Sequence, residues 1–219
     1  MIALPVEDLP VDRPAVRGAP LRLATADGTR FPAYRALPVE PAAAGVVVLP
    51  DVRGAREFHD DLAHGFAEAG VAALVLDRYD RDLVQPAVRA AVDHLFALGV
   101  TAAFTVGFGL GGALSWAQAA LEPRLAGAIG FCGRPAGCRD LVGRMTRPVL
   151  VLAAGADALT PVEESLAFDR ALTEAGVPHE FRLYEAAPHS FFDGDLPDQA
   201  DHAADAWRRV LAFIEEHGA

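Results

Sequence analysis

Short apolar runs alternate with segments of helical period along most of this chain. The first buried run spans residues 45–50, and the segment that follows it, 56–70, carries Phe58, Leu62 and Phe66 at a spacing of four. That spacing places side chains on one face of a helix, whereas an apolar run bounded by turn residues is typical of a buried strand. The alternation continues to the end of the chain and predicts repeated strand–helix units on a parallel sheet.

The remaining elements follow from the same pattern. Further strands are predicted at 71–77, 101–107, 126–131, 148–153 and 179–184, and further helices at 83–99, 111–121, 161–176 and 197–217. The strands are apolar on both faces, so helices must cover both sides of the sheet. Residues 21–25 and 30–37 flank the turn dipeptide Asp27-Gly28 and predict an antiparallel hairpin. The predicted fold class is therefore α/β, with a mostly parallel central sheet, helices on both faces and an N-terminal antiparallel hairpin.

The start of the chain does not share this pattern. Residues 1–18 contain three prolines and three acidic residues and lack the continuous apolar core of a secretory signal. We expect residues 1–18 to form a surface arm and residues 19–219 to form a single domain. The uncharged run 95–121 is long enough to span a bilayer, but four glycines between 107 and 112 interrupt it. A strand, a tight turn and a helix explain this run better than a membrane span.

Composition and charge narrow the classes of partner. The 19 basic residues are all arginine and face 30 acidic residues, which gives a net charge of −11. Nucleic acid and anionic membranes bind cationic faces, so we expect neither as a partner. Cys132 and Cys138 are too few for a disulfide framework, and no histidine has a partner at metal-ligand spacing. We therefore predict a cytoplasmic protein without a metal or a cofactor.

Residues able to carry chemistry follow the predicted strands at their carboxyl ends, where open α/β sheets bind ligands. In chain order they are Asp51-Val-Arg-Gly54, Asp77-Arg-Tyr-Asp-Arg81, Gly107-Phe-Gly-Leu-Gly-Gly112, Cys132, Gly155-Ala-Asp157 and Ala187-Pro-His189-Ser-Phe191. A glycine-rich turn, then an acid, then a histidine is the order found in α/β hydrolases.

These motifs resemble those of the dienelactone hydrolases, which are small single-domain α/β hydrolases. The resemblance covers residues 20–217 and rests on the motifs at 47–54, 77–81, 107–112, 155–161 and 184–191. It implies an α/β-hydrolase fold and action on a small lactone or ester. It also implies that Asp157 is the acid and His189 the base.

The chain departs from the family pattern at one position. The family presents Cys or Ser at the centre of its G-x-C-x-G-G turn, and this chain has Gly109, which has no atom that can attack a carbonyl. The resemblance still implies that Asp157 orients the imidazole of His189, whose Nε2 then takes a proton from a water beside Gly109. By analogy, the backbone N–H groups of Leu110 and Val52 are expected to form an oxyanion hole.

Five further residues are candidates for contacting the substrate. Arg81 matches a family arginine that engages a substrate carboxylate, which implies a carboxylated substrate; alternatively it is a loop residue paired with neighbouring aspartates. Asp51 replaces a family glutamate and is a second acid/base group, a partner of Arg53, or a surface loop residue. Cys132 is a relocated thiol nucleophile or a small buried apolar residue. Phe191 is expected in the wall of a pocket.

Three functions are open at this point. The first is a dienelactone-hydrolase-like enzyme that acts on a small, carboxylated lactone or ester, with His189 and Asp157 activating water. The second keeps the fold and binds a small molecule or a partner without catalysis. The third is an acid/base enzyme of the isomerase, cyclase or dehydratase type, which moves a proton without hydrolysis.

Overall fold

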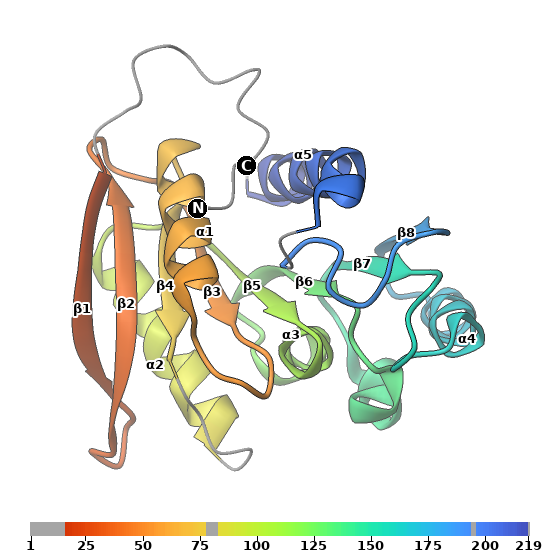
Figure 1. The fold of residues 1–219 in the computed structure, drawn as a ribbon. Helices are drawn as coiled ribbons and strands as arrows, with labels where there is room; N and C mark the ends of the chain where they lie inside the picture. The colour runs from red at the N-terminus through yellow and green to blue at the C-terminus, as the bar shows by residue number, and fades with distance from the viewer. Residues whose placement is uncertain (1–15, 78–82, 194–195, 219) are drawn as a thin grey trace.

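A computed structural model describes residues 16–77, 83–193 and 196–218, which form one mixed sheet with helices on both faces (Figure 1). The strands are β1 (Val16–Ala24), β2 (Arg30–Pro38), β3 (Ala44–Leu49), β4 (Ala72–Leu76), β5 (Ala102–Phe108), β6 (Leu125–Phe131), β7 (Val149–Ala154) and β8 (His179–Tyr184). The helices are α1 (Glu57–Glu68), α2 (Val84–Ala97), α3 (Leu110–Leu121), α4 (Val162–Glu174) and α5 (Ala200–His217). Short 3-10 helices are η3 (Pro135–Gly137), η4 (Arg139–Arg144) and η5 (Pro197–Gln199).

The sheet has the strand order β1-β2-β4-β3-β5-β6-β7-β8. β2 is antiparallel to β1 and to β4, and the strands β4, β3, β5, β6, β7 and β8 are parallel to one another. The predicted fold class is confirmed. The ends of the parallel strands and of most helices lie within two residues of their predicted positions, whereas α5 begins later than expected because η5 precedes it.

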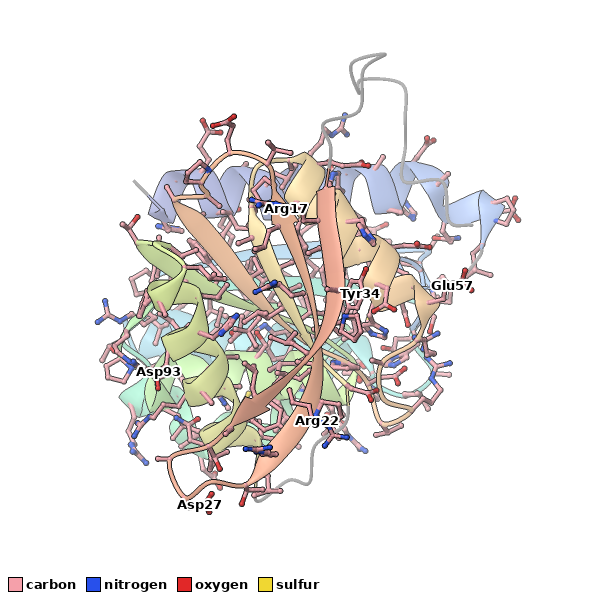
Figure 2. The ribbon with its side chains drawn as sticks, turned by 90° about the vertical axis from the view of Figure 1, so that its left-hand side faces the viewer. Arg17, Arg22, Asp27, Tyr34, Glu57 and Asp93 are labelled. Carbon is pink, nitrogen blue, oxygen red and sulfur yellow. The ribbon has the colours of Figure 1, made fainter. Side chains whose placement is uncertain are left out.

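The N-terminal hairpin is longer than the sequence predicted. β1 begins at Val16, which pairs with Pro38, so the prediction that residues 1–18 form an arm is wrong for residues 16–18. Because β1 is an edge strand, it is only partly buried and tolerates Pro20, so the apolar signal of the inner strands is missing there. Figure 2 looks onto this edge and labels Arg17 and Arg22 on β1.

Helices α1 and α5 pack on one face of the sheet, and α2, α3 and α4 pack on the other. Alternate residues of β3 point to opposite faces of the sheet. Val46 and Val48 pack in the core on the α1 side, and Val47 and Leu49 pack in the core on the α2 side. All four side chains are fully buried, which follows from the pleat of a strand covered on both faces.

The uncharged run at 95–121 forms the end of α2, strand β5 and helix α3, as predicted. No helix in the described part of the chain is long and apolar enough to span a membrane.

Candidate active site

The turn between β5 and α3 forms the centre of the site. Gly109 has φ 52° and ψ −114° there, a left-handed backbone that glycine adopts with little steric cost. A Cβ on Gly107 would lie 2.0 Å from the carbonyl oxygen of Gly111, and one on Gly111 would lie 2.1 Å from that of Leu49. The glycines therefore let α3 begin directly against the carboxyl ends of β3 and β5.

Asp157 and His189 form a hydrogen-bonded pair at the same edge of the sheet. His189 Nδ1 lies 2.7 Å from Asp157 Oδ2, and Asp157 Oδ1 accepts the backbone N–H groups of Leu159 at 2.7 Å and Thr160 at 3.1 Å. The side chain of Asp157 is 1% exposed. A carboxylate acceptor holds the ring proton on Nδ1, so Nε2 keeps the lone pair that a general base needs.

The free nitrogen of His189 faces Gly109. A Cβ built on Gly109 would lie 3.2 Å from His189 Nε2 and 3.7 Å from Asp51 Cβ. The imidazole therefore points at the place that a side chain at position 109 would occupy, and Asp51 borders the same place. The structure thus brings together four residues that the sequence singled out: Asp51, Gly109, Asp157 and His189.

Asp51 is a partner of Arg53, which was one of the three roles predicted for it. The backbone N–H of Arg53 donates to Asp51 Oδ1 at 2.8 Å, and Arg53 Nε donates to Oδ2 at 2.7 Å. Partial burial raises the pKa of the Asp51 carboxyl, but the hydrogen bonds from Arg53 and the charges of Arg53 and Arg56 outweigh burial, so the pKa lies below its ordinary value. Asp51 is therefore ionised at neutral pH.

Two charged residues of the site were missed by the sequence analysis. Arg56 donates to Asp193 Oδ2 at 2.7 Å, and Arg53 reaches the same oxygen at 3.5 Å. The side chain of Asp193 is 8% exposed. The sequence position of Asp193 could have indicated its place in the site, because Asp193 follows His189 in the same loop. Arg56 has no such indication in the sequence, except that it precedes a helix.

His59 is a third residue whose role the sequence did not show, since helix periodicity predicted an ordinary helix residue. Its side chain is fully buried, and Nδ1 accepts the backbone N–H of Arg56 at 3.1 Å. Burial, with the charge of Arg56, lowers the pKa of His59 to about 4. The ring is therefore neutral with its proton on Nε2, which has no acceptor among the described residues.

Cys132 lies next to the Asp157–His189 pair. Its Sγ, one carboxylate oxygen of Asp157 and one ring nitrogen of His189 all lie within 4.8 Å of one another. Its φ of 49° is the one positive φ outside glycine in the described residues. Burial, together with the charges of Asp157 and Asp193, raises the pKa of the Cys132 thiol well above its usual value. A protonated thiol is a poor nucleophile.

The other candidates have different placements. Leu110 is the first residue of α3, where backbone N–H groups lack intrahelical acceptors. Val52 has a side chain that is 78% exposed, so a role in the site must come from its backbone. Phe191 is 1% exposed and packs on Tyr184 of β8, and its place in the wall of a pocket stays a prediction. Arg81 lies outside the described residues.

A groove with a volume of about 560 Å³ lies between the hairpin and α1. Its lining includes Arg22, Tyr34, Arg56, Glu57, Asp60 and Asp77, of which Figure 2 labels three. Arg56 also contacts Asp193, so Arg56 belongs both to the lining of the groove and to the charged cluster of Arg56 and Asp193.

Comparison with known proteins places this arrangement in a family. A family model described as the dienelactone hydrolase family matches residues 31–102 and 84–218. The chain belongs to the dienelactone hydrolase family. Two relatives are named "Putative carboxymethylenebutenolidase": one from Yersinia pestis is 27% identical and covers 87% of this chain and 85% of its own. The other, from Methylorubrum extorquens, is 27% identical and covers 86% of this chain and 77% of its own.

Solved structures agree with the fold of this family member. One from Klebsiella pneumoniae, named "Putative Dienelactone Hydrolase", superposes with a TM-score of 0.79 at 21% identity, over 92% of this chain and 99% of the other. An esterase from Pyrococcus furiosus superposes with a TM-score of 0.78 at 13% identity, over 93% of each chain.

Proposed function

We propose that this dienelactone hydrolase family member hydrolyses a small, carboxylated lactone or ester, with His189 and Asp157 activating water directly. One observation carries the proposal: the free nitrogen of His189, held by Asp157, faces a position at Gly109 where no side chain stands. The names of the relatives, which describe an enzyme acting on a butenolide with a carboxymethylene group, supply the substrate class.

The reaction follows from the positions of these groups. A water beside Gly109 donates a hydrogen bond to His189 Nε2, and its oxygen attacks the acyl carbon as the proton passes to Nε2. Asp157 stabilises the imidazolium that forms. Backbone N–H groups of Leu110 and Val52 stabilise the tetrahedral oxyanion. When the intermediate collapses, the imidazolium returns the proton to the leaving alkoxide, and a lactone opens to a hydroxy acid.

Gly109 limits this enzyme to reactive substrates. We place it where other family members carry their nucleophile, so an acyl-enzyme cannot form at this position. Loss of the nucleophile costs about 10⁶ in turnover in a serine protease, while binding and the oxyanion hole retain roughly 10³–10⁴ over water. Strained lactones and activated aryl esters are therefore the substrates expected, and ordinary alkyl esters are not.

The test is hydrolysis of an activated aryl lactone in the presence of a chelator by the wild type and by His189→Ala. We expect the substitution to lower kcat/KM by about 10²–10⁴, the contribution of a general base. His179→Gln, which changes a histidine bonded to Asp169 instead, is the matched control and should keep the activity. Equal turnover in the wild type and His189→Ala would refute the proposal.

The absence of a side chain at Gly109 also favours a second function, in which the site binds its ligand without catalysing a reaction. This alternative predicts that a lactone or its hydroxy acid raises the thermal unfolding temperature of the protein while no product forms. Conversion of that same lactone by the wild type would exclude it.

A further inference from the structure

Cys132 has no part in the hydrolysis described above, yet its thiol lies at the catalytic pair. Its Sγ, a carboxylate oxygen of Asp157 and a ring nitrogen of His189 lie within 4.8 Å of one another. We infer that these three side chains bind a divalent cation of the zinc type. Thiolate, imidazole and carboxylate are the ligand classes that Zn²⁺ takes in proteins, and three protein ligands leave one position for water.

The spacing of the three atoms suits such an ion. Zinc bonds of roughly 2.0–2.3 Å in a tetrahedral site separate the ligand atoms by about 3.3–3.8 Å. Side-chain movements of about 1 Å therefore bring the three groups into coordination, with the 2.7 Å contact between His189 and Asp157 opening and the Cys132 contacts closing.

The ligands are held by the surrounding core. Cys132 is 5% exposed, and its backbone N–H donates to the carbonyl oxygen of Leu152 at 2.9 Å, at the end of two paired strands. Asp157 is fixed through its other oxygen by the amides of Leu159 and Thr160. Because the side chains of Cys132 and Asp157 are already held in place, they lose little conformational entropy when a cation binds.

The local charge favours a cation. The carboxylates of Asp157 and Asp193 act on the thiol, and Asp193 pairs with Arg53 and Arg56, which also pair with Asp51. Together these linked groups are three carboxylates and two guanidinium groups. This leaves an excess of one negative charge. The same carboxylates that oppose a free thiolate stabilise a thiolate that is bound to a divalent cation, because the ion inverts the local electrostatics.

Cation binding and base catalysis exclude each other at this site. A cation on Nδ1 of His189 takes the place of the proton that Asp157 accepts, and a cation on Nε2 takes the lone pair that accepts the proton of water. Zinc is therefore expected to switch the pair off reversibly. The binding itself does not depend on the proposed hydrolysis, so the two are tested separately.

The test uses the full chain, freed of metal with a chelator and titrated with Co²⁺ and then with Zn²⁺. We expect a thiolate-to-cobalt charge-transfer band and one zinc ion per chain at this site. Cys132→Ala should abolish the band and weaken Zn²⁺ binding by at least about 100-fold, since even an outer-shell partner contributes 10–100-fold. Cys138→Ala removes a thiol that is equally buried but lies elsewhere, and should change neither result.

Two further controls keep the result unambiguous. Glu180, Glu216 and His217 form a second, more exposed cluster, so every titration is repeated in a His217→Ala background. Cys132→Ser preserves the size of the side chain and should also lose the band, and circular dichroism checks that each variant is folded. A wild type without the band, or Zn²⁺ binding that is equal in the wild type, Cys132→Ala and Cys132→Ser, would overturn the inference.

Discussion

Gly109 decides which chemistry the His189–Asp157 pair beside it can carry out. His189 and Asp157 keep the arrangement of a general base and its orienting acid, and the turn at Gly109 keeps a left-handed backbone with φ 52°. Other residues pay a steric cost for that conformation, whereas glycine does not. The turn therefore presents open space, instead of an attacking atom, to the Nε2 of His189.

Substitutions at Gly109 separate water attack from covalent attack. Gly109→Ala adds a Cβ that would lie 3.2 Å from His189 Nε2, so it crowds the place of the water and should lower lactonase activity at least 10-fold, roughly one lost catalytic contact. Gly109→Ser adds the same Cβ with a hydroxyl that His189 can deprotonate. It should hydrolyse activated esters faster than the wild type, with a burst of product.

Both Gly109 variants should be less stable than the wild type by about 1–2 kcal/mol, because an L-residue is strained at this φ. Urea unfolding measures this loss of stability. An equal loss in the alanine and serine variants shows that their activities differ because of the added hydroxyl and not because of a difference in stability. An alanine variant as active as the wild type would contradict the place assigned to the water.

The motifs pointed to Asp157, His189 and the turn at Gly109, because each follows a strand whose end the apolar pattern marks; the acid and base roles implied by the family resemblance stay predictions. Arg56, His59 and Asp193 were missed for a physical reason. The Arg56–Asp193 pair joins residues 137 positions apart, and the burial of His59 depends on how α1 packs on the sheet. Neither property is encoded in local spacing.

Among the secondary-structure elements, α1 couples the site to the stability of the fold. Its first turn carries His59, which is buried against Phe108 of β5, and this helix begins at the charged cluster of Arg56 and Asp193. A buried neutral histidine at the start of a helix makes this element sensitive to acid.

His59 predicts how stability changes with pH. Its pKa is about 4 in the folded protein against an ordinary 6.5, so the unfolded chain takes up the proton first as the pH falls. Its stabilising contribution is complete above pH 6.5 and is lost toward pH 4. Between pH 7 and pH 5 the free energy of unfolding should fall by about 2 kcal/mol more in the wild type than in His59→Gln.

Urea unfolding at the two pH values measures this difference. His64→Gln on the same helix is the control: it removes a histidine that bonds to Tyr34 at the hairpin and leaves His59 in place, so its stability should fall with pH as that of the wild type does. An equal loss of stability in the wild type and His59→Gln would show that the buried ring does not titrate as described.

Elements buried on both faces were predicted well and elements at the edges less well. The inner strands are continuous apolar runs, so their ends are visible in the sequence. β1 pairs on one side only and contains Pro20, so its first residues looked like an arm. The 3-10 helices between β6 and β7 have no periodic pattern of their own and were not predicted.

For the molecule as a whole, the net charge of −11 opposes the approach of an anionic substrate. Raising the ionic strength from about 0.01 M to about 0.1 M shortens the Debye length from roughly 30 Å to roughly 10 Å. kcat/KM for a carboxylated lactone should therefore rise severalfold over this range, while that for its neutral methyl ester should stay constant. A fall for the carboxylated compound would mean that local arginines, and not the overall charge, govern its encounter.

The central claim is that water, directed by His189 and Asp157, attacks the substrate without a covalent intermediate. It is tested most directly by a single turnover with enzyme in excess over lactone in ¹⁸O-labelled water, with the product and the intact protein weighed by mass spectrometry. We predict one labelled oxygen in the carboxylate of each product molecule and an unchanged protein mass throughout. An unlabelled product, or an acyl group found on the protein at Cys132 or Asp51, would contradict the claim.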